Sequence, residues 1–376
     1  SHLSHAALFK DGKLISAIAE ERLTRRKAEM GFPINSINFL LQKHNLSGSD
    51  IDQVFMAGEK SLPFIKIYRR DVNFTVLDWV QQNEKFFFPK LVLGKKLNAL
   101  DDFEMFKSVN KNLTEDPLFP FIEKLKSNPE ANPRSLLDDT YREVFNKEFG
   151  ISADKIAFFR HEDCHKSYGV FSAPERPTQS LIFTCEGGGD DSSATLSVLK
   201  YDKIEELWSS NNCSLGRLYR NVTIFLGMKP GQDEYKIMGL APYSSEKYGK
   251  IALEFFREVD AVDGIKVERQ PVHKDLYFAM SNRLKGLRFD GIAWGLQTYL
   301  EETLLQWVEN AIKQTGITNV IFSGGVAQNI KAMKVLAEAD AVEKFWVGPV
   351  TGDGSLGIGA AVLGIENNFN IKVDQL

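Results

Sequence analysis

Two histidines stand four residues apart in the segment His161-Glu162-Asp163-Cys164-His165. On a helix this spacing puts both imidazoles on one face, at a separation suited to a single metal ion. A metal site requires a third ligand. Asp353 is the candidate, because it is a carboxylate on the turn Gly352-Asp353-Gly354 that opens a helix. The alternative is a pair of surface or hydrogen-bonded histidines. The metal site is therefore expected only if folding brings Asp353 to the histidine pair.

Glycine-rich loops follow apolar runs in Gly187-Gly188-Gly189 and Ser323-Gly324-Gly325, and a third lies at residues 352–359. A strand, a glycine loop and a helix in succession present backbone N–H groups and a helix dipole to a phosphate. Each loop alone could be a plain turn. Together they favour a phosphate-binding cleft between two lobes. None has the P-loop ending Gly-Lys-Ser/Thr, and no complete dinucleotide fingerprint stands near the start, which disfavours P-loop enzymes and dehydrogenases.

An acid and a base lie close together in the segment 234–243, which contains Glu234 and Lys236 beside an apolar turn. A carboxylate at such a bend could accept a hydroxyl proton, and the lysine could offset phosphate charge. A solvent-exposed Glu–Lys pair is the alternative interpretation. The charged run from Glu20 to Lys27 is expected to be solvated.

The elements that must position these residues occur twice. A β-rich run at residues 6–9 and another at 13–19 flank Asp11-Gly12, a pair that favours the tight turn of a hairpin. A helical pattern at 34–44 and a strand at 54–57 follow. The second copy has a buried strand at 181–184, a glycine loop, and a hairpin formed by 194–201 and 204–209. This is a weak internal repeat at a long period. The chain enters its first strand almost at once after Ser1, as if a preceding strand had been removed.

Residues 59–150 are rich in Phe and Lys, show helical stretches and contain no glycine loop, so they are expected to be a helical insertion. Their aromatic clusters, Phe86-Phe87-Phe88 and Phe119-Pro120-Phe121, are expected to form a small core of their own and not a binding surface. A long amphipathic helix is expected at residues 292–311.

The length of 376 residues suggests two lobes with an insertion. A net charge of −4 provides no field to attract nucleic acid or an anionic membrane. Three widely spaced cysteines form neither a disulfide framework nor a thiolate zinc site, which fits a reducing compartment. With no membrane-spanning run and no leader sequence, a cytoplasmic location is expected.

Taken together, these residues resemble the O-carbamoyltransferase family that includes the nodulation-factor, cephamycin and aminoglycoside carbamoyltransferases. The likeness covers nearly the whole chain outside residues 59–150. Its landmarks are residues 18–27 with Gly31-Phe32-Pro33, then 161–171, 214–219, 234–243, 323–329 and 352–360.

The resemblance implies the α/β fold of actin and the sugar kinases, duplicated into two lobes around a nucleotide cleft and shared with the tRNA threonylcarbamoyl transferase. On this basis residues 1–58 would begin lobe I, and 59–150 would be the helical insertion. Residues 151–179 would carry the metal-ligand helix, and 180–376 would form lobe II with the glycine loops and closing helices.

In such enzymes a companion C-terminal domain makes carbamoyl-adenylate from carbamoyl phosphate and ATP, and the actin-like domain moves the carbamoyl group to a small-molecule hydroxyl acceptor. The resemblance implies that His161, His165 and Asp353 hold iron or another divalent metal. The residues expected along the nucleotide are Gly187, Gly188, Gly189, Ser323, Gly324, Gly325 and Asn329. Together, His2 and Glu234 would be the candidates for the base and the acceptor-orienting group, and Lys236 stands beside Glu234 in the sequence. No membrane or nucleic-acid partner is expected.

Two positions depart from the family pattern. Leu3 stands where the family has Asp directly after the first histidine, and Glu186-Gly187 stands where it usually has Asp-Gly. No adenylating domain is recognised, so either the chain is a fragment or the activated donor comes from elsewhere. A nucleotide- and metal-binding module without turnover is therefore the alternative function. A tRNA-modifying relative is a further alternative, which the negative charge disfavours.

Overall fold

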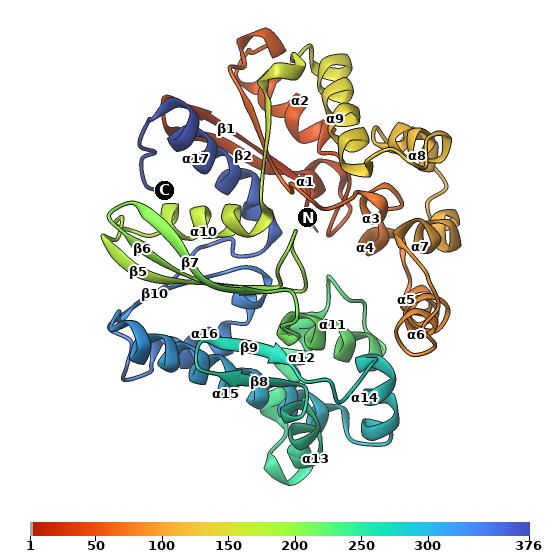
Figure 1. Cartoon of the computed structure of the whole chain (residues 1–376), viewed down its shortest axis with the longest axis vertical. Helices are drawn as coiled ribbons and strands as arrows, with labels where there is room; N and C mark the ends of the chain where they lie inside the picture. The colour runs from red at the N-terminus through yellow and green to blue at the C-terminus, as the bar shows by residue number, and fades with distance from the viewer. Residues whose placement is uncertain (1–2) are drawn as a thin grey trace. The chain divides into compact units, whose positions relative to one another are not determined.

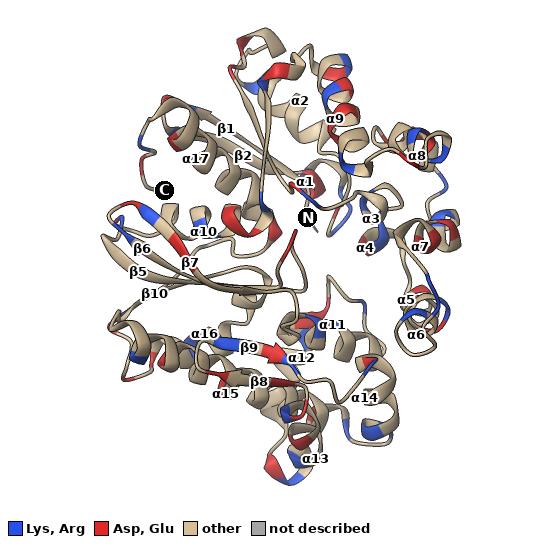
Figure 2. Ribbon diagram, in the orientation of Figure 1, with Lys and Arg blue, Asp and Glu red and all other residues tan. Residues whose placement is uncertain are grey.

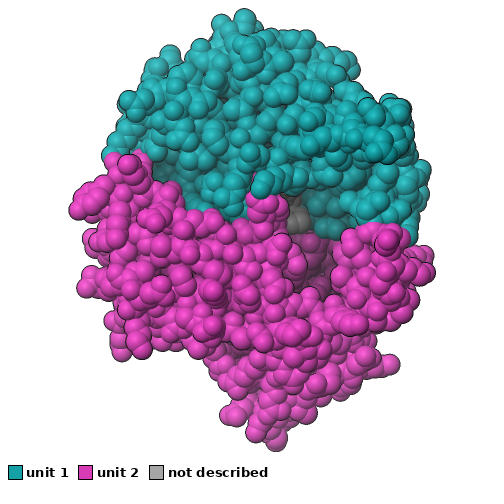
Figure 3. Space-filling view, viewed as in Figure 1, with its two compact units in different colours: residues 1–74, 98–171, 353–376 teal, residues 75–97, 172–352 magenta. Residues whose placement is uncertain are grey.

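The computed structural model describes residues 3–376, which divide into two compact units (Figures 1 and 3). Unit 1 comprises Ser1–Phe74, Asn98–Phe171 and Asp353–Leu376, and unit 2 comprises Thr75–Leu97 and Ser172–Gly352. Each unit is therefore assembled from segments that lie far apart in the sequence. The domain limits expected from the sequence remain a prediction.

Unit 1 opens with an antiparallel hairpin of β1 (His5–Lys10) and β2 (Lys13–Ala19). Its turn residues Asp11 and Gly12 have φ angles of 51° and 77°, as a tight turn between twisted strands requires. The expected hairpin is thus confirmed. Helices α1 (Glu20–Thr24) and α2 (Ile34–Lys43) follow.

Glu20 corrects the expectation that the charged run is solvated. Its side chain is buried, and its carboxylate accepts bonds from the backbone N–H groups of Asn35 and Ser36, at 3.2 and 2.8 Å. Both N–H groups lie in the first turn of α2, where a helix leaves donors without partners of its own. Glu20 is therefore a buried anchor for this helix.

A parallel pair of strands, β3 (Val54–Ala57) and β4 (Ile156–Phe159), forms the second sheet of unit 1. β4 leads directly into α10 (His161–Phe171), which packs along the closing helix α17 (Leu356–Phe369). The two helices approach very closely. A Cβ added at Gly359 would lie 2.0 Å from the Cys164 carbonyl oxygen, so only glycine fits.

The Phe- and Lys-rich segment is helical, and its two terminal parts belong to unit 1. Its aromatic side chains pack on one another in unit 1, where the ring of Phe64 lies 6.0 Å from Phe103 and 5.7 Å from Phe121. Both signs of charge are spread along its helices (Figure 2), as in the 2.6 Å ion pair between Lys124 and Glu143. The helices are α3 (Phe64–Ile67), α4 (Arg70–Asn73), α5 (Val76–Gln82), α6 (Phe88–Leu91), α7 (Ala99–Phe106), α8 (Phe119–Ser127) and α9 (Pro133–Phe149).

Unit 2 contains a five-stranded sheet in the order β11-β10-β5-β6-β7. The first strand along the chain, β5, lies in the middle of the sheet, parallel to β10 and antiparallel to β6. The glycine-rich segment 186–193 joins β5 to β6. The strands are β5 (Gln179–Cys185), β6 (Ala194–Lys200), β7 (Lys203–Ser210), β10 (Asn319–Ser323) and β11 (Lys344–Val347).

The helices of unit 2 pack around α15 (Phe289–Thr315), which extends beyond both ends of the expected helix. Its apolar face, from Leu296 to Val308, is buried in the core of unit 2 with Trp307. The other elements are α11 (Leu215–Phe225), α12 (Glu234–Leu240), α13 (Glu246–Arg257), α14 (Leu276–Leu284), α16 (Ile330–Ala337) and a small hairpin of β8 (Asp260–Asp263) and β9 (Lys266–Arg269). Among residues 3–376, no helix combines the length and apolar character needed to cross a bilayer.

Candidate metal centre and glycine loops

The two histidines that the sequence singled out lie in the first two turns of α10. Both side chains are buried, with His161 6% and His165 0% exposed, and their ring centroids are 4.9 Å apart. The helical spacing of four residues therefore places both imidazoles together, as expected for residues on one helix face.

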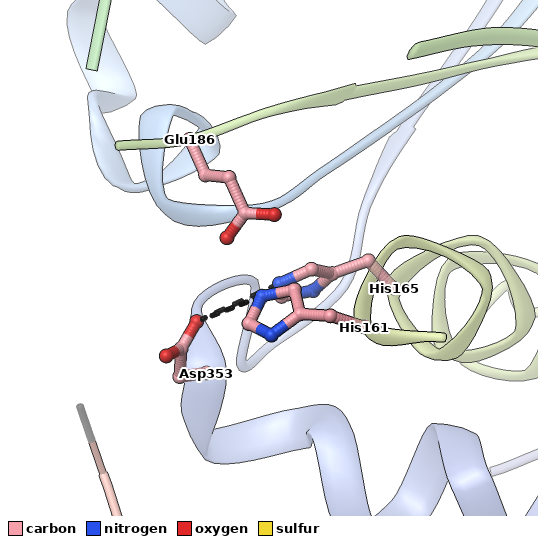
Figure 4. Close-up of side chains that lie close together, drawn as sticks. All are labelled: His161, His165, Glu186 and Asp353. Atoms are coloured by element: carbon pink, nitrogen blue, oxygen red, sulfur yellow. Dashed lines mark ion pairs between the residues drawn. The ribbon is translucent and has the colours of Figure 1, made fainter. Parts of the chain in front are cut away.

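Asp353 joins this pair within unit 1, as Figure 4 shows. It opens a short 3₁₀ turn, Asp353–Ser355, directly before α17. Its Oδ1 atom lies 3.5 Å from Nε2 of His161 and 3.6 Å from Nε2 of His165. Two imidazole nitrogens and one carboxylate oxygen thus converge. This donor set is one that divalent iron, zinc or a similar ion accepts. Glu186, also drawn in Figure 4, belongs to unit 2 and follows β5.

The electrostatics of Asp353 favour an ionised carboxylate. Burial alone would raise the pKa of this carboxyl, but the charge and hydrogen bonds of His161 and His165 outweigh burial and hold that pKa well below its ordinary range. A carboxylate that is already ionised has no proton to lose when it binds a cation. The three side chains could therefore hold a metal ion.

His5 is a residue at this site that the sequence reasoning missed. Its Nδ1 lies 2.9 Å from the Leu3 carbonyl, and its Nε2 accepts the Gly357 N–H of α17 at 2.8 Å. These partners require the neutral tautomer with its proton on Nδ1. Burial, the main influence, lowers the pKa of His5, in agreement with a neutral ring. His5 thus connects β1 to the first turn of α17, just after Asp353. The only sequence signal was its place beside the candidate His2, which itself lies outside the described residues.

The first glycine loop, in unit 2, is closed by its own backbone. Glu186 N–H donates to the Ser193 carbonyl at 2.8 Å and Gly189 N–H to the Ser192 carbonyl at 2.9 Å. Arg217 donates to the Gly187 carbonyl at 2.8 Å. A Cβ added at Gly187 would meet no atom within 4 Å. This part of the loop therefore has room for a ligand beside its backbone.

The second glycine loop follows β10 at Ser323. Gly324 has a φ of 91°, and a Cβ on it would lie 2.7 Å from the Cys185 carbonyl oxygen, so glycine is required. Within the described part of the chain, the buried hydroxyls of Ser323 and Thr351 have no hydrogen-bond partner. Gly324 N–H donates to the Thr351 carbonyl at 2.9 Å, so the segment that follows β11 lies beside this loop. Buried hydroxyls without partners are uncommon in native proteins and fit a polar ligand here.

Asn329 follows this loop, and its side chain is bonded to protein groups. Its Oδ1 accepts the Ala332 N–H at 3.0 Å, which caps α16. Its Nδ2 donates to the Tyr219 hydroxyl at 3.0 Å and to Oε1 of Gln297 at 2.9 Å. The structure therefore places Asn329 in a buried amide network that orients the start of α16.

Glu234 and Lys236 lie in the first turn of α12, also in unit 2. Glu234 is half-buried, and its Oε1 accepts the Gly231 N–H at 2.6 Å. Lys236 is exposed and forms a 2.9 Å ion pair with Asp233. Neither residue belongs to the unit that carries the histidine pair.

Curated relatives match the chain over lengths that range from about half of it to nearly all of it. An uncharacterised protein of Synechocystis is 24% identical, and the match covers 96% of this chain and 55% of that protein. The nodulation protein NolNO of Sinorhizobium fredii is 27% identical over 96% of this chain and 46% of its own length. The nodulation protein NolO of Bradyrhizobium diazoefficiens is 31% identical over 49% of this chain and 34% of its own length. The chain thus spans about half the length of the first two relatives.

Solved structures with a similar arrangement include full-length HypF in a phosphate- and nucleotide-bound form. It has a TM-score of 0.35 and 12% identity, covering 64% of this chain and 43% of HypF. A ROK family protein of Streptococcus pneumoniae has a TM-score of 0.34 and 11% identity, covering 61% of this chain and 71% of that protein.

The expected fold class is confirmed. In unit 2 an antiparallel three-stranded meander, β5-β6-β7, is extended by the parallel strands β10 and β11, which is the sheet of the actin- and sugar-kinase-like α/β fold. A family model described as the carbamoyltransferase N-terminus matches residues 1–362. The likeness to carbamoyltransferases that the motifs indicated is therefore correct, and the chain belongs to the carbamoyltransferase N-terminus family.

Proposed function

We propose that this chain transfers a carbamoyl group from carbamoyl-adenylate to a hydroxyl group of a small-molecule acceptor. The observation that carries the proposal is the convergence of His161, His165 and Asp353 in a chain of the carbamoyltransferase family. The match of residues 1–362 to the carbamoyltransferase N-terminus model supports the same class of reaction.

The metal would be held by His161, His165 and Asp353. Two histidines and one carboxylate are the ligand set of many non-haem iron sites, so iron or a similar divalent ion fits best. Such an ion would stabilise negative charge on a phosphate or carbonyl oxygen. Within unit 1, Gly359 and His5 serve this site by fixing the approach of α10 to α17 and by bonding to the first turn of α17.

The nucleotide phosphates would bind at the two glycine loops of unit 2. The space beside Gly187 and the partnerless hydroxyls of Ser323 and Thr351 support this assignment. Gly188, Gly189, Gly324 and Gly325 would present backbone to the phosphates. Asn329 would act by orienting α16, because its amide is bonded to Gln297 and Tyr219.

The transfer itself needs a base. The acceptor oxygen would give its proton to the Glu234 carboxylate and form a bond to the carbamoyl carbon. The bond between that carbon and the adenylate phosphate oxygen would break, and AMP would leave with the electron pair. Lys236 would offset negative charge nearby, and His2 would orient the acceptor.

The test supplies preformed carbamoyl-adenylate, because the chain spans about half of its relatives. AMP release and carbamoylated product are measured with a panel of hydroxyl acceptors. We expect Glu234→Gln to lower the rate roughly a hundredfold, the usual scale for losing a general base. Glu246→Gln is the matched control, because Glu246 also opens a helix of unit 2 and is exposed. Full activity of Glu234→Gln would remove Glu234 from this role.

A binding module without turnover is the second candidate, and Leu3 is the observation that favours it. Leucine cannot replace the carboxylate that the family resemblance leads one to expect at this position. Binding of ATP and a divalent metal without any AMP release from carbamoyl-adenylate would support this alternative and contradict the transferase proposal.

A further inference from the structure

Residues 85–97 carry positive charge that no acidic side chain compensates. They lie in the part of the Phe- and Lys-rich segment that belongs to unit 2. They contain no acidic residue, and their four lysines are all exposed: Lys85, Lys90, Lys95 and Lys96. Across residues 3–376, none of the four forms an ion pair. We call residues 90–96, with the sequence Lys-Leu-Val-Leu-Gly-Lys-Lys, the basic tip.

The next lysines along the chain, in the unit 1 part of the same segment, show a different arrangement. Lys107 forms an ion pair with Glu104 at 2.6 Å, and Lys126 binds the other oxygen of the same carboxylate at 2.5 Å. Both lysines therefore have their charge balanced within the protein. The uncompensated charge is thus a local property of residues 85–97 and not of the whole segment.

Apolar side chains of the basic tip are exposed as well. Leu91 is 45% and Leu93 is 60% exposed, although large aromatic side chains of the same segment are buried, with Trp79 2% and Phe86 5% exposed. Single exposed leucines are normal on a protein surface, whereas a cluster of them indicates an interaction site. The basic tip combines such a cluster with lysines on both sides of it.

The basic tip is an ordered turn and not a loose end. The Lys95 N–H donates to the Pro89 carbonyl at 2.9 Å, and the Leu93 N–H donates to the Phe88 carbonyl at 3.3 Å. At its base, the ring of Phe88 lies 4.8 Å from the ring of Phe278 in α14 of unit 2. The two leucines are therefore held at the surface by a turn that is itself anchored to unit 2.

The residue types of the basic tip select among anionic partners. Protein interfaces are depleted in Lys and enriched in Arg and aromatic residues. Single-stranded nucleic acids are bound through Arg and exposed aromatic rings, on which bases stack. In the basic tip Lys is the only cation, and the exposed apolar side chains are aliphatic. An anionic bilayer fits both, because its headgroups attract lysine and its acyl chains accept leucine.

We propose that the basic tip binds the surface of an anionic lipid bilayer. Leu91 and Leu93 would enter the boundary between headgroups and acyl chains, and the lysines on both sides would contact the headgroups. This peripheral binding requires no membrane-spanning helix. The net charge of −4, from which no attraction to a membrane was expected, opposes it little, because exposed charges farther away than about 8 Å are largely screened at physiological ionic strength.

The experiment measures binding of the chain, by flotation, to vesicles of phosphatidylcholine alone and of phosphatidylcholine mixed with phosphatidylglycerol. Leu91→Ser/Leu93→Ser removes the apolar surface of the basic tip, and Lys95→Gln/Lys96→Gln removes two of its charges. Each has a matched control in unit 2. The controls are Val272→Ser, at an aliphatic side chain that is 61% exposed, and Lys200→Gln/Lys203→Gln, at exposed lysines of the β6–β7 turn.

We expect the chain to bind the mixed vesicles at least about tenfold more tightly than phosphatidylcholine vesicles. The lysine variant should bind the mixed vesicles about 25-fold more weakly, at roughly fivefold for each charge. The leucine variant should lose at least about tenfold, and the two controls should bind like the wild type. Equal binding to both kinds of vesicle, or variants of the basic tip that bind like the controls, would overturn the proposal.

Polyuridylic acid tests the competing partner class. RNA binding that weakens in the lysine variant but not in the leucine variant, without binding to either vesicle, would assign the basic tip to nucleic acid and overturn the proposal. No carbamoyl donor, nucleotide or metal is used, so the outcome is independent of the proposed activity.

Discussion

The histidine pair and Asp353 show how three side chains create a cation site that each alone would not. The imidazoles of His161 and His165 are buried, and the Asp353 carboxylate lies at ion-pair distance from both. A buried carboxylate is stable only when positive charge or hydrogen bonds compensate its lost hydration. These two imidazoles supply that compensation without a metal, and an ion between them would supply it more strongly.

Replacing any one of His161, His165 and Asp353 by alanine should lower the affinity for Fe²⁺ or Zn²⁺ by at least about tenfold, since even loss of an outer-shell partner costs 10- to 100-fold. His44→Ala is the matched control, because His44 is a half-buried histidine of the same unit whose Nε2 bonds Ser16 at 2.8 Å. Isothermal titration with the metal alone measures the effect. Equal affinities in the three variants and the wild type would contradict a shared site.

Asp260 makes the stability of unit 2 depend on pH. Burial raises the pKa of this carboxyl to about 6, against the bonds from the Ser214 N–H at 2.9 Å and the Tyr299 hydroxyl at 3.1 Å. The folded state therefore holds a proton that the unfolded chain releases near pH 4. The contribution of protonated Asp260 to the free energy of unfolding is fully present below about pH 4 and is lost as the pH rises through 6.

Asp260→Asn should remove this dependence, because the amide stays neutral and can still bond both partners. Relative to the wild type, the variant should gain stability between about pH 4 and 7, by at most about 3 kcal/mol. Urea unfolding at several pH values measures the difference. Asp263→Asn, at the exposed end of the same strand, should show no such trend. Parallel pH profiles for Asp260→Asn and the wild type would contradict the assignment.

At the scale of elements, the crossing of α10 and α17 decides whether the site exists. The histidines belong to α10 and Asp353 precedes α17, so the distance between these helices sets the distance between the ligands. Gly359 allows the close approach, since a Cβ there would lie 2.0 Å from a carbonyl oxygen of α10. The clashing atom is a backbone oxygen of Cys164, and backbone cannot move aside as the end of a flexible side chain can.

Gly359→Ala should therefore destabilise the protein by about 2 kcal/mol or more, in the range of overpacked cores. It should also weaken metal binding, because α10 must move away from Asp353. Asn367→Ala, at an exposed position of α17, is the control. Urea unfolding and metal titration test the two effects. A Gly359→Ala protein with unchanged metal affinity would show that the helix contact does not position the ligands.

At the scale of the whole molecule, the residues that are candidates for binding the metal and the nucleotide belong to different units. The metal residues belong to unit 1, and the glycine loops with Glu234 belong to unit 2. Ligands that bind only the folded protein stabilise the part that holds them, by about 2.7 kcal/mol at a hundredfold excess over Kd.

A divalent metal alone should thus slow hydrogen exchange in α10 and α17 by up to about a hundredfold, with β5 and β10 little changed. ATP without metal should protect the loops after β5 and β10 instead. Exchange measured by mass spectrometry separates the two patterns. Protection by metal that appears in the glycine loops but not in α10 would refute this division.

Local sequence patterns were sufficient for much of the fold. The Asp11-Gly12 turn, the apolar strand before each glycine loop and the spacing of His161 and His165 all depend on neighbouring residues, and the structure has the hairpin, the strands and the shared helix face at these positions. The family motifs are also local, which is why the resemblance led to the correct family and fold class.

Tertiary structure alone decided which distant residues meet. The sequence named Asp353 as a candidate, but only the packing of α10 on α17 brings its carboxylate to the histidines. Nothing local showed that Glu20 would be buried under α2, or that His5 would accept the Gly357 N–H. Such contacts join segments far apart in the chain, and their geometry depends on how whole elements pack, which no window of sequence contains.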